Sequence, residues 1–189
     1  MRKLVIVVTA IAVALVLAAF AIALSGHIPT NANAIPPKLE IRIATAALDA
    51  AMNHHAPRVR NPIEPTDRNL IAGMKVYTAN CSMCHGTLDM KESPLTHSFY
   101  PPVPQLILDP LDDPEWRTNY VIRTGVRYTG MPAWSGSLSE QDIWKVTAFL
   151  SHVDTLPAEA RQYWSDAFGV DPPQRGSQRG PAKENMQHK

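Results

Sequence analysis

The chain has 189 residues, enough for one ordinary domain with additional segments, because single domains cluster near about 100–150 residues. Its net charge is +1, and its hydrophobic and charged fractions of 45% and 19% are close to those of average globular proteins. The sequence contains no basic stripe, which excludes a nucleic-acid-binding function. It has two cysteines and no second Cys or His pair at usable spacing, which excludes a four-ligand structural zinc site.

An uncharged apolar segment occupies residues 4–24, directly after Arg2 and Lys3. A helix of this length, at about 1.5 Å per residue, crosses a hydrocarbon core of about 30 Å. We therefore expect a transmembrane anchor, with the basic residues in the cytoplasm and the remainder of the chain on the far side. A cleaved signal peptide is the alternative, with a small-x-small site at 32–34. However, the apolar segment exceeds the about 7–15 residues of a signal core.

Residues 25–66 are predicted to form a proline-rich spacer between the anchor and a folded domain, since proline-rich linkers are extended. Within it, residues 36–50 have the spacing of a short helix that begins with prolines, although residues 39–43 also alternate like a strand. The adjacent His54 and His55 lack a third ligand, so we interpret them as exposed side chains and not as a metal site.

Residues 67–156 are predicted to form a mainly α-helical domain. Apolar residues at helical spacing predict its first helix over 67–79, with Asp67 as the N-cap. Gly73 interrupts this helix at a cost of about 1 kcal/mol relative to alanine, which indicates that another backbone passes close to it.

The last helix of this domain is predicted over 140–153, after a capping pair formed by Ser139 and Asp142. A shorter helix is expected over 114–124. The remaining chain between the first and last helices is mostly loop, and a loop region of this size requires a large apolar group to pack against.

Beyond this domain, residues 157–170 are predicted to contain one more short helix. Hydrophobic residues nearly vanish from residue 171 onward, so we expect a disordered tail over 171–189. Trp164 together with this tail is a candidate docking element for a larger complex.

The sequence Cys81-Ser82-Met83-Cys84-His85 is a Cys-x-x-Cys-His motif, the attachment signature of c-type haem. Two thiols one helical turn apart can each add to a haem vinyl group, and His85 then presents its imidazole to the iron. A thioredoxin-like redox pair is the alternative, but such a pair follows a strand, whereas this motif ends a predicted helix. We therefore predict one haem c, covalently bound to Cys81 and Cys84 and ligated by His85.

The second axial ligand must follow the motif, and the candidates are Met90, His97 and Met131. Met90 is too close to the proximal histidine in sequence to reach the opposite face of the macrocycle. Met131 lies between Gly130, which lets the backbone approach the haem, and Pro132, which stiffens the loop. We predict Met131 as the ligand, because methionine–histidine ligation is the pattern of cytochromes c.

These features resemble the class I cytochrome c family, in the form of single-haem bacterial domains, over residues 61–153. Gly73 and Tyr77 match the glycine and the aromatic residue of the family's first helix. Residues 122–134 resemble its distal loop, and residues 143–150 its final helix, which crosses the first. The resemblance implies a class I cytochrome c fold, a small helical domain wrapped around one covalent haem.

The resemblance also implies further contacts of the haem. A proline carbonyl should accept a hydrogen bond from the ring of the proximal histidine; residues 101–104 are the candidate segment, with the individual proline left open. Arg127 and Trp134 are candidate donors to the haem propionates, and an exposed arginine and a core tryptophan are the alternative. Residues 86–91 depart from the glycine-rich loop of many relatives.

The implied function is one-electron transfer by a non-enzymatic carrier, anchored by a single span in a bacterial inner membrane with its haem domain in the periplasm. The implied partners are the membrane and a quinol-oxidising complex, a terminal oxidase or a periplasmic dehydrogenase, or the chain is the cytochrome subunit of a larger oxidoreductase. The alternative is a haem enzyme or gas sensor, peroxidase-like, with an open sixth iron site. It requires Met131 to be absent from the iron, and His97 is its candidate distal residue.

Overall fold

The structure is a computed structural model that describes residues 1–175, which contain seven α-helices, one 3₁₀ helix and no strand. The predicted mainly helical fold is confirmed. In chain order, the elements are α1 (Arg2–Leu24), α2 (Lys38–His55), α3 (Asp67–Asn80), α4 (Ser82–His85), α5 (Glu115–Thr124), η1 (Trp134–Gly136), α6 (Glu140–Ser151) and α7 (Ala158–Phe168). The chain divides into two compact units, Met1–Ala34 and a second that begins at Ile35.

The first unit consists of α1 and the segment that follows it. Helix α1 has no buried residue, and an 18-residue window within it has a mean hydropathy of 3.1. Among residues 1–175 it is the one helix long and apolar enough to cross a membrane. These properties are compatible with a single-pass membrane anchor.

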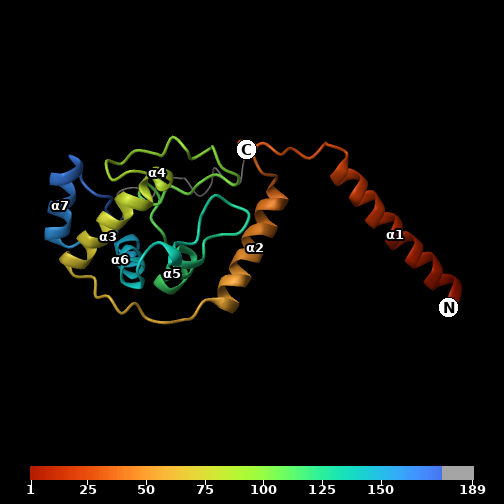
Figure 1. The fold of residues 1–189 in the computed structure, drawn as a ribbon, viewed down its shortest axis with the longest axis horizontal. Coiled ribbons are helices and arrows are strands. Elements are labelled where there is room, and N and C mark those ends of the chain that lie inside the picture. Colours follow the sequence, from red (N-terminus) through yellow and green to blue (C-terminus); the bar gives the residue numbers. More distant parts are fainter. Residues whose placement is uncertain (176–189) are drawn as a thin grey trace. The chain divides into compact units, whose positions relative to one another are not determined.

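The core of the second unit forms where α3 packs across α6 (Figure 1). A Cβ atom on Gly73 would lie 2.3 Å from the carbonyl oxygen of Lys145 and 2.7 Å from the Cβ atom of Phe149, so glycine is required for this approach. The predicted close passage of a second backbone at Gly73 is therefore confirmed. Helix α6 also packs against α5, and the apolar side chains buried in this core include Leu70, Met74, Tyr77, Ile122, Ile143, Val146, Phe149 and Leu150.

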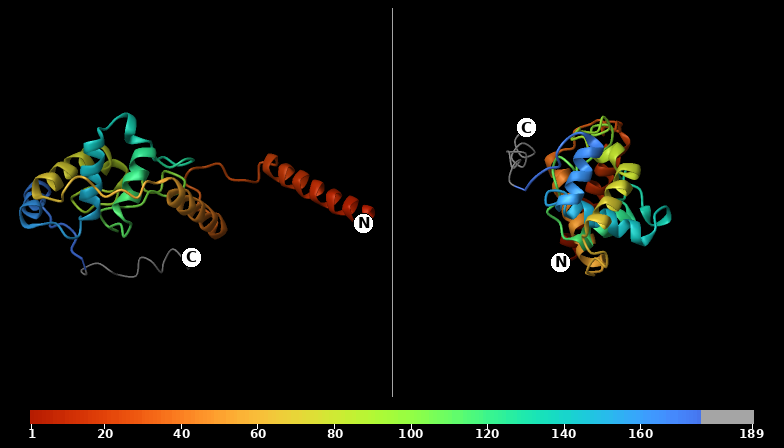
Figure 2. Two further views of the ribbon diagram at one scale, coloured as in Figure 1. Left: turned by 90° about the horizontal axis from the view of Figure 1, so that it is seen from below. Right: turned by 90° about the vertical axis from the view of Figure 1, so that its left-hand side faces the viewer.

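Helix α7 packs against α3 (Figure 2). Its Trp164 is fully buried, with a ring centroid 6.1 Å from that of Phe149 and 6.1 Å from that of Phe168. Trp164 is therefore a core residue, and its interpretation as part of a docking element is wrong. Burial of a large aromatic side chain fixes α7 to the domain.

The helix caps agree with the prediction at α6 and differ at α3. The hydroxyl of Ser139 accepts a hydrogen bond from the backbone N–H of Asp142, as predicted. The N-cap of α3 is Thr66, one residue before the predicted Asp67. The Asp67 carboxylate instead accepts a hydrogen bond from the backbone N–H of Ala160 at 2.7 Å, which caps the first turn of α7.

Helix α2 occupies 18 of the 42 residues predicted as a spacer, and residues 39–43 are helical and not a strand. Met52 and Ala56 are buried against the domain, and Asp49 forms an ion pair with Arg117 of α5. Residues 38–56 therefore belong to the second unit, because α2 has apolar and charged side chains that find partners on it. This differs from the extended stalk expected from proline content.

The predicted tail begins with residues that pack on the domain. Pro172 and Pro173 are buried, and the Nε atom of Arg175 lies 3.2 Å from a carboxylate oxygen of Asp154. The remainder of the predicted tail, residues 176–189, lies outside the described residues.

Candidate functional site

The Cys-x-x-Cys-His motif lies at the end of α3, where the chain turns directly into α4. Cys81 is both the C-cap of α3 and the N-cap of α4. Its carbonyl oxygen accepts hydrogen bonds from the backbone N–H groups of Cys84 at 3.1 Å and His85 at 2.9 Å. This single turn of helix places the two half-buried, free thiols one turn apart, as addition to two vinyl groups of one haem requires.

The phenol of Tyr77 fixes the end of this turn. It is fully buried, and its hydroxyl lies 2.9 Å from the carbonyl oxygen of His85 and 2.8 Å from that of Gly86. Burial raises the pKa of Tyr77, so the phenol remains neutral and donates. The backbone N–H of Leu106 donates to the same His85 carbonyl at 3.0 Å.

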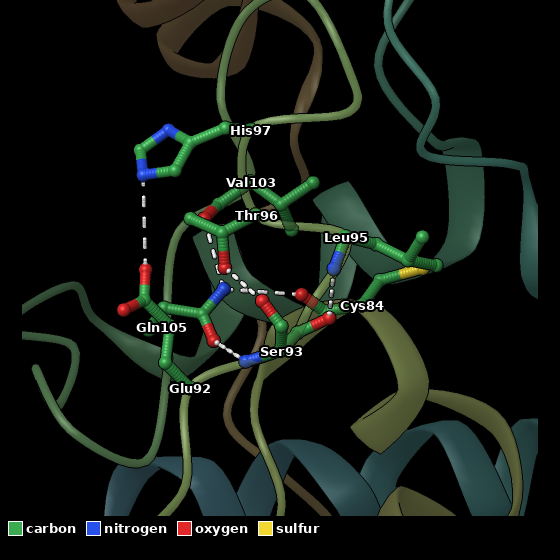
Figure 3. A network of polar contacts seen from close by, with 8 residues as sticks. All are labelled: Cys84, Glu92, Ser93, Leu95, Thr96, His97, Val103 and Gln105. Atoms are coloured by element: carbon green, nitrogen blue, oxygen red, sulfur yellow. Dashed lines mark hydrogen bonds and ion pairs between the residues drawn. The ribbon is translucent and has the colours of Figure 1, made fainter.

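Gln105 holds the middle of the turn through a network of polar contacts (Figure 3). Its amide nitrogen donates to the carbonyl oxygens of Cys84 at 3.1 Å and Val103 at 3.0 Å, and its amide oxygen accepts from the backbone N–H of Ser93 at 2.8 Å. The hydroxyl of Ser93 donates to the carbonyl oxygen of Met83 at 2.5 Å. The backbone carbonyls of residues 83–86 are thus all paired, and the thiol of Cys84 points away from this network.

The imidazole of His85 is oriented by Pro104, whose carbonyl oxygen lies 2.9 Å from Nδ1. Of the prolines in residues 101–104, Pro104 is therefore the one whose carbonyl contacts the imidazole ring. With Nδ1 engaged, Nε2 is the nitrogen available to bind iron, as in other sites where an outer hydrogen bond fixes a ligand histidine. Burial lowers the pKa of His85, partly opposed by the Pro104 hydrogen bond, and this favours the neutral imidazole that a metal requires.

The environment of Cys81 suits a thioether better than a free thiolate. Burial, together with the charge of Cys84, raises the pKa of Cys81 to about 12. A thioether carries no charge, so the desolvation that disfavours the thiolate does not oppose covalent attachment of a haem. The residues present at this turn therefore fit a c-type haem.

The loop that carries Met131 is shaped by two glycines. Gly125 ends α5 with a φ of 65°, and a Cβ atom there would lie 2.6 Å from the backbone of Pro132. A Cβ atom on Gly130 would lie 2.5 Å from the ring of Phe99. The backbone N–H of Met131 donates to the Thr129 hydroxyl, and Met131 is half-buried against the core of the domain.

The other predicted site residues lie in different surroundings. The side chain of His97 is 82% exposed, with Nε2 4.0 Å from a carboxylate oxygen of Glu92, and it points away from the network that holds the motif (Figure 3). Arg127 is exposed, whereas Trp134 is half-buried against the core at the start of η1. Met90 is half-buried, with a positive φ of 61°.

The segment that departs from the glycine-rich loop of relatives forms a compact turn. The backbone N–H of Thr87 donates to the carbonyl oxygen of Lys91 at 3.0 Å, and the side chain of Leu88 is buried in the core. Sequence reasoning did not identify the roles of Ser93 and Gln105 around the motif. Both lie in loops without periodicity, so the single sequence carries no signal for these contacts.

A family model and a solved structure each match part of the chain. Residues 68–150 match the family model "Cytochrome C oxidase, cbb3-type, subunit III". Among solved structures, a chain of the Kuenenia stuttgartiensis reducing HAO-like protein complex Kustc0457/Kustc0458 is 23% identical over 53% of this chain, with a TM-score of 0.39. The match spans about half of that chain, 52%. No curated protein matches the chain. Residues 68–150 therefore form a c-type cytochrome domain, which implies haem c as its cofactor and electron transfer as its chemistry.

Proposed function

We propose that this protein is a one-electron carrier with a single haem c, bound covalently through Cys81 and Cys84 and ligated by His85 and Met131. When bound, the haem supplies a one-electron iron couple. The observation that carries the proposal is the contact between Nδ1 of His85 and the Pro104 carbonyl, because it leaves Nε2 available as a ligand.

The residues around the motif support a rigid ligand set. Tyr77 and Gln105 hold the carbonyl groups of the turn, so the proximal histidine keeps one orientation in both oxidation states. Methionine as the second ligand raises the reduction potential and fills the site at which a substrate would bind. Arg127 and Trp134 are proposed to donate hydrogen bonds to the haem propionates, which are otherwise costly to bury.

The proposed location is the periplasmic side of a bacterial inner membrane, with α1 as an uncleaved single-pass anchor. Arg2 and Lys3 favour the cytoplasmic side, which supports this orientation. The proposed partners are a quinol-oxidising complex, a terminal oxidase or a periplasmic dehydrogenase. The chain either carries electrons between such complexes or is a fixed cytochrome subunit of one of them. The matching family is described as an oxidase subunit, which supports the terminal oxidase as the first partner to test.

The test is an optical spectrum of the reduced, purified holoprotein before and after addition of carbon monoxide. An unchanged low-spin spectrum is expected, because both axial positions are filled in an electron carrier. A prompt spectral shift would show an open or readily displaced sixth position and would favour the haem enzyme or gas sensor instead.

A further inference from the structure

The N-terminal half of α2 presents apolar side chains that find no partner in the described part of the chain. Residues 38–48 are all exposed, including Leu39 at 68% and Ile43 at 61%, and Ile35 just before the helix is 90% exposed. Leu39 and Ile43 are one helical turn apart and continue into an alanine stripe at residues 46, 47 and 50. We name the stripe formed by residues 39, 43, 46, 47 and 50 the α2 apolar face.

Three side chains of α2 that lie outside the α2 apolar face contact the haem domain. Met52 is buried, Asp49 forms an ion pair with Arg117, and near the start of the helix Glu40 accepts a hydrogen bond from the hydroxyl of Tyr100 at 2.6 Å. Helix α2 is therefore held along its length in one orientation. Its apolar face is presented by the domain as a surface, and contiguous exposed apolar surface of this kind marks an interaction site.

We propose that the α2 apolar face binds the surface of the bilayer in which α1 is anchored, and so holds the haem domain in one orientation on the membrane. This inference rests on the proposed role of α1 as an uncleaved anchor. Only residues 25–37 separate the end of α1 from the start of α2. A chain of that length spans at most about 45 Å and typically about 20 Å, so α2 remains close to the membrane surface.

The composition of α2 suits a helix that lies in the interfacial region. Leu39 and Ile43 can insert below the headgroups, while the stem of Arg42 lies along the apolar surface with its charge in water. A few inserted side chains are enough to bind α2 to the bilayer surface, because the anchor raises the effective concentration of the helix there. The bilayer is favoured over a second copy of the chain. A helical segment about 16 Å long offers far less than the about 800 Å² per partner of a stable interface.

The proposal changes how the carrier meets its partners. A domain held by α1 alone would rotate freely about residues 25–37, whereas a domain also bound through α2 presents the same face of its haem site at all times. A weak attachment through α2 is sufficient to fix this orientation, because α1 already holds the chain at the bilayer.

Site-directed spin labelling of the full-length holoprotein tests the proposal. Cys81 and Cys84 are the only cysteines and are consumed by haem attachment, so an introduced cysteine is the single reactive thiol. A nitroxide is placed by Ile43→Cys on the α2 apolar face, by Val59→Cys as an exposed control on the domain, and by Leu15→Cys within α1. Each protein is reconstituted into phosphatidylcholine–phosphatidylglycerol vesicles and reduced, so that the iron is diamagnetic.

Power saturation then compares relaxation of each nitroxide by oxygen, which concentrates in the bilayer, and by a water-soluble nickel chelate. We expect the ratio of relaxation by oxygen to relaxation by the nickel chelate to be several-fold higher for the label at position 43 than for the label at position 59. An aqueous label at position 43, with a membrane-buried label at position 15, overturns the proposal and leaves the anchor intact. Aqueous labels at both positions overturn the anchor as well. Spin–spin broadening at position 43 that grows with protein density identifies a second copy as the occupant and also overturns it.

Discussion

The hydroxyl of Tyr77 lies 2.8 Å from the carbonyl oxygen of Gly86 and thereby ties the core helix α3 to the residue that follows His85. The bond is buried, and the phenol is the partner that this carbonyl finds within the described residues. The position of His85 is thus coupled to the packing of α3 against α6.

Replacement of Tyr77 by phenylalanine should lower the free energy of unfolding of the holoprotein by about 1–3 kcal/mol, because a buried carbonyl is left unpaired. The measurement is urea denaturation followed by the haem absorbance. Tyr128→Phe is the matched control, since Tyr128 is 91% exposed and should be neutral. Equal midpoints for the two variants would contradict the role of the phenol.

Gly73→Ala should destabilise the domain by about 1–3 kcal/mol, despite the higher helix propensity of alanine. The added Cβ atom would meet the Lys145 carbonyl at 2.3 Å, and a backbone atom cannot rotate away. Thermal unfolding measures the effect. At Gly136 a Cβ atom meets nothing within 4 Å, so Gly136→Ala should stay within about 0.5 kcal/mol of the natural protein. Unchanged stability of Gly73→Ala would show that α3 and α6 leave space for a Cβ atom at this position.

Gln105→Leu should loosen the turn that carries the motif, because the carbonyl of Cys84 and the amide of Ser93 both lose a hydrogen bond. We expect a loss of about 1–3 kcal/mol and faster hydrogen exchange at the Ser93 amide, measured by NMR or mass spectrometry. Gln162→Leu is the control, since Gln162 is exposed and bonds Asp166 within α7. Unaltered exchange at Ser93 in Gln105→Leu would disprove the contact.

Acid extraction of the haem tests its covalent attachment. Cys81→Ala and Cys84→Ala should each retain the haem through the remaining thioether, with a pyridine haemochrome spectrum shifted from that of the natural protein. The double variant should release it, and Ser82→Ala should behave like the natural protein. Release from the natural protein, or retention by the double variant, would rule out attachment at these cysteines.

The sequence predicts those parts of the fold that rest on local patterns. The apolar stripe of α3, the capping pair of α6 and the motif itself are all readable from spacing. The predicted N-cap of α3 is wrong, because Asp67 accepts a hydrogen bond from the distant residue Ala160, a contact that helical periodicity cannot reveal. The contacts of Pro104 and Gln105 depend on how two irregular loops fold around α4, which the sequence alone does not predict. The sequence also does not predict that α2 packs on the domain, because its partner Arg117 is distant in the chain.

The central claim, that His85 and Met131 are the two axial ligands, is tested most directly by the midpoint potential of Met131→Ala measured beside Met90→Ala. Both methionines are half-buried and packed against the core, so they are matched in environment. We predict that Met131→Ala lowers the potential and lets the reduced iron bind carbon monoxide, while Met90→Ala changes neither. An unchanged potential and no carbon monoxide binding in Met131→Ala would contradict the assignment.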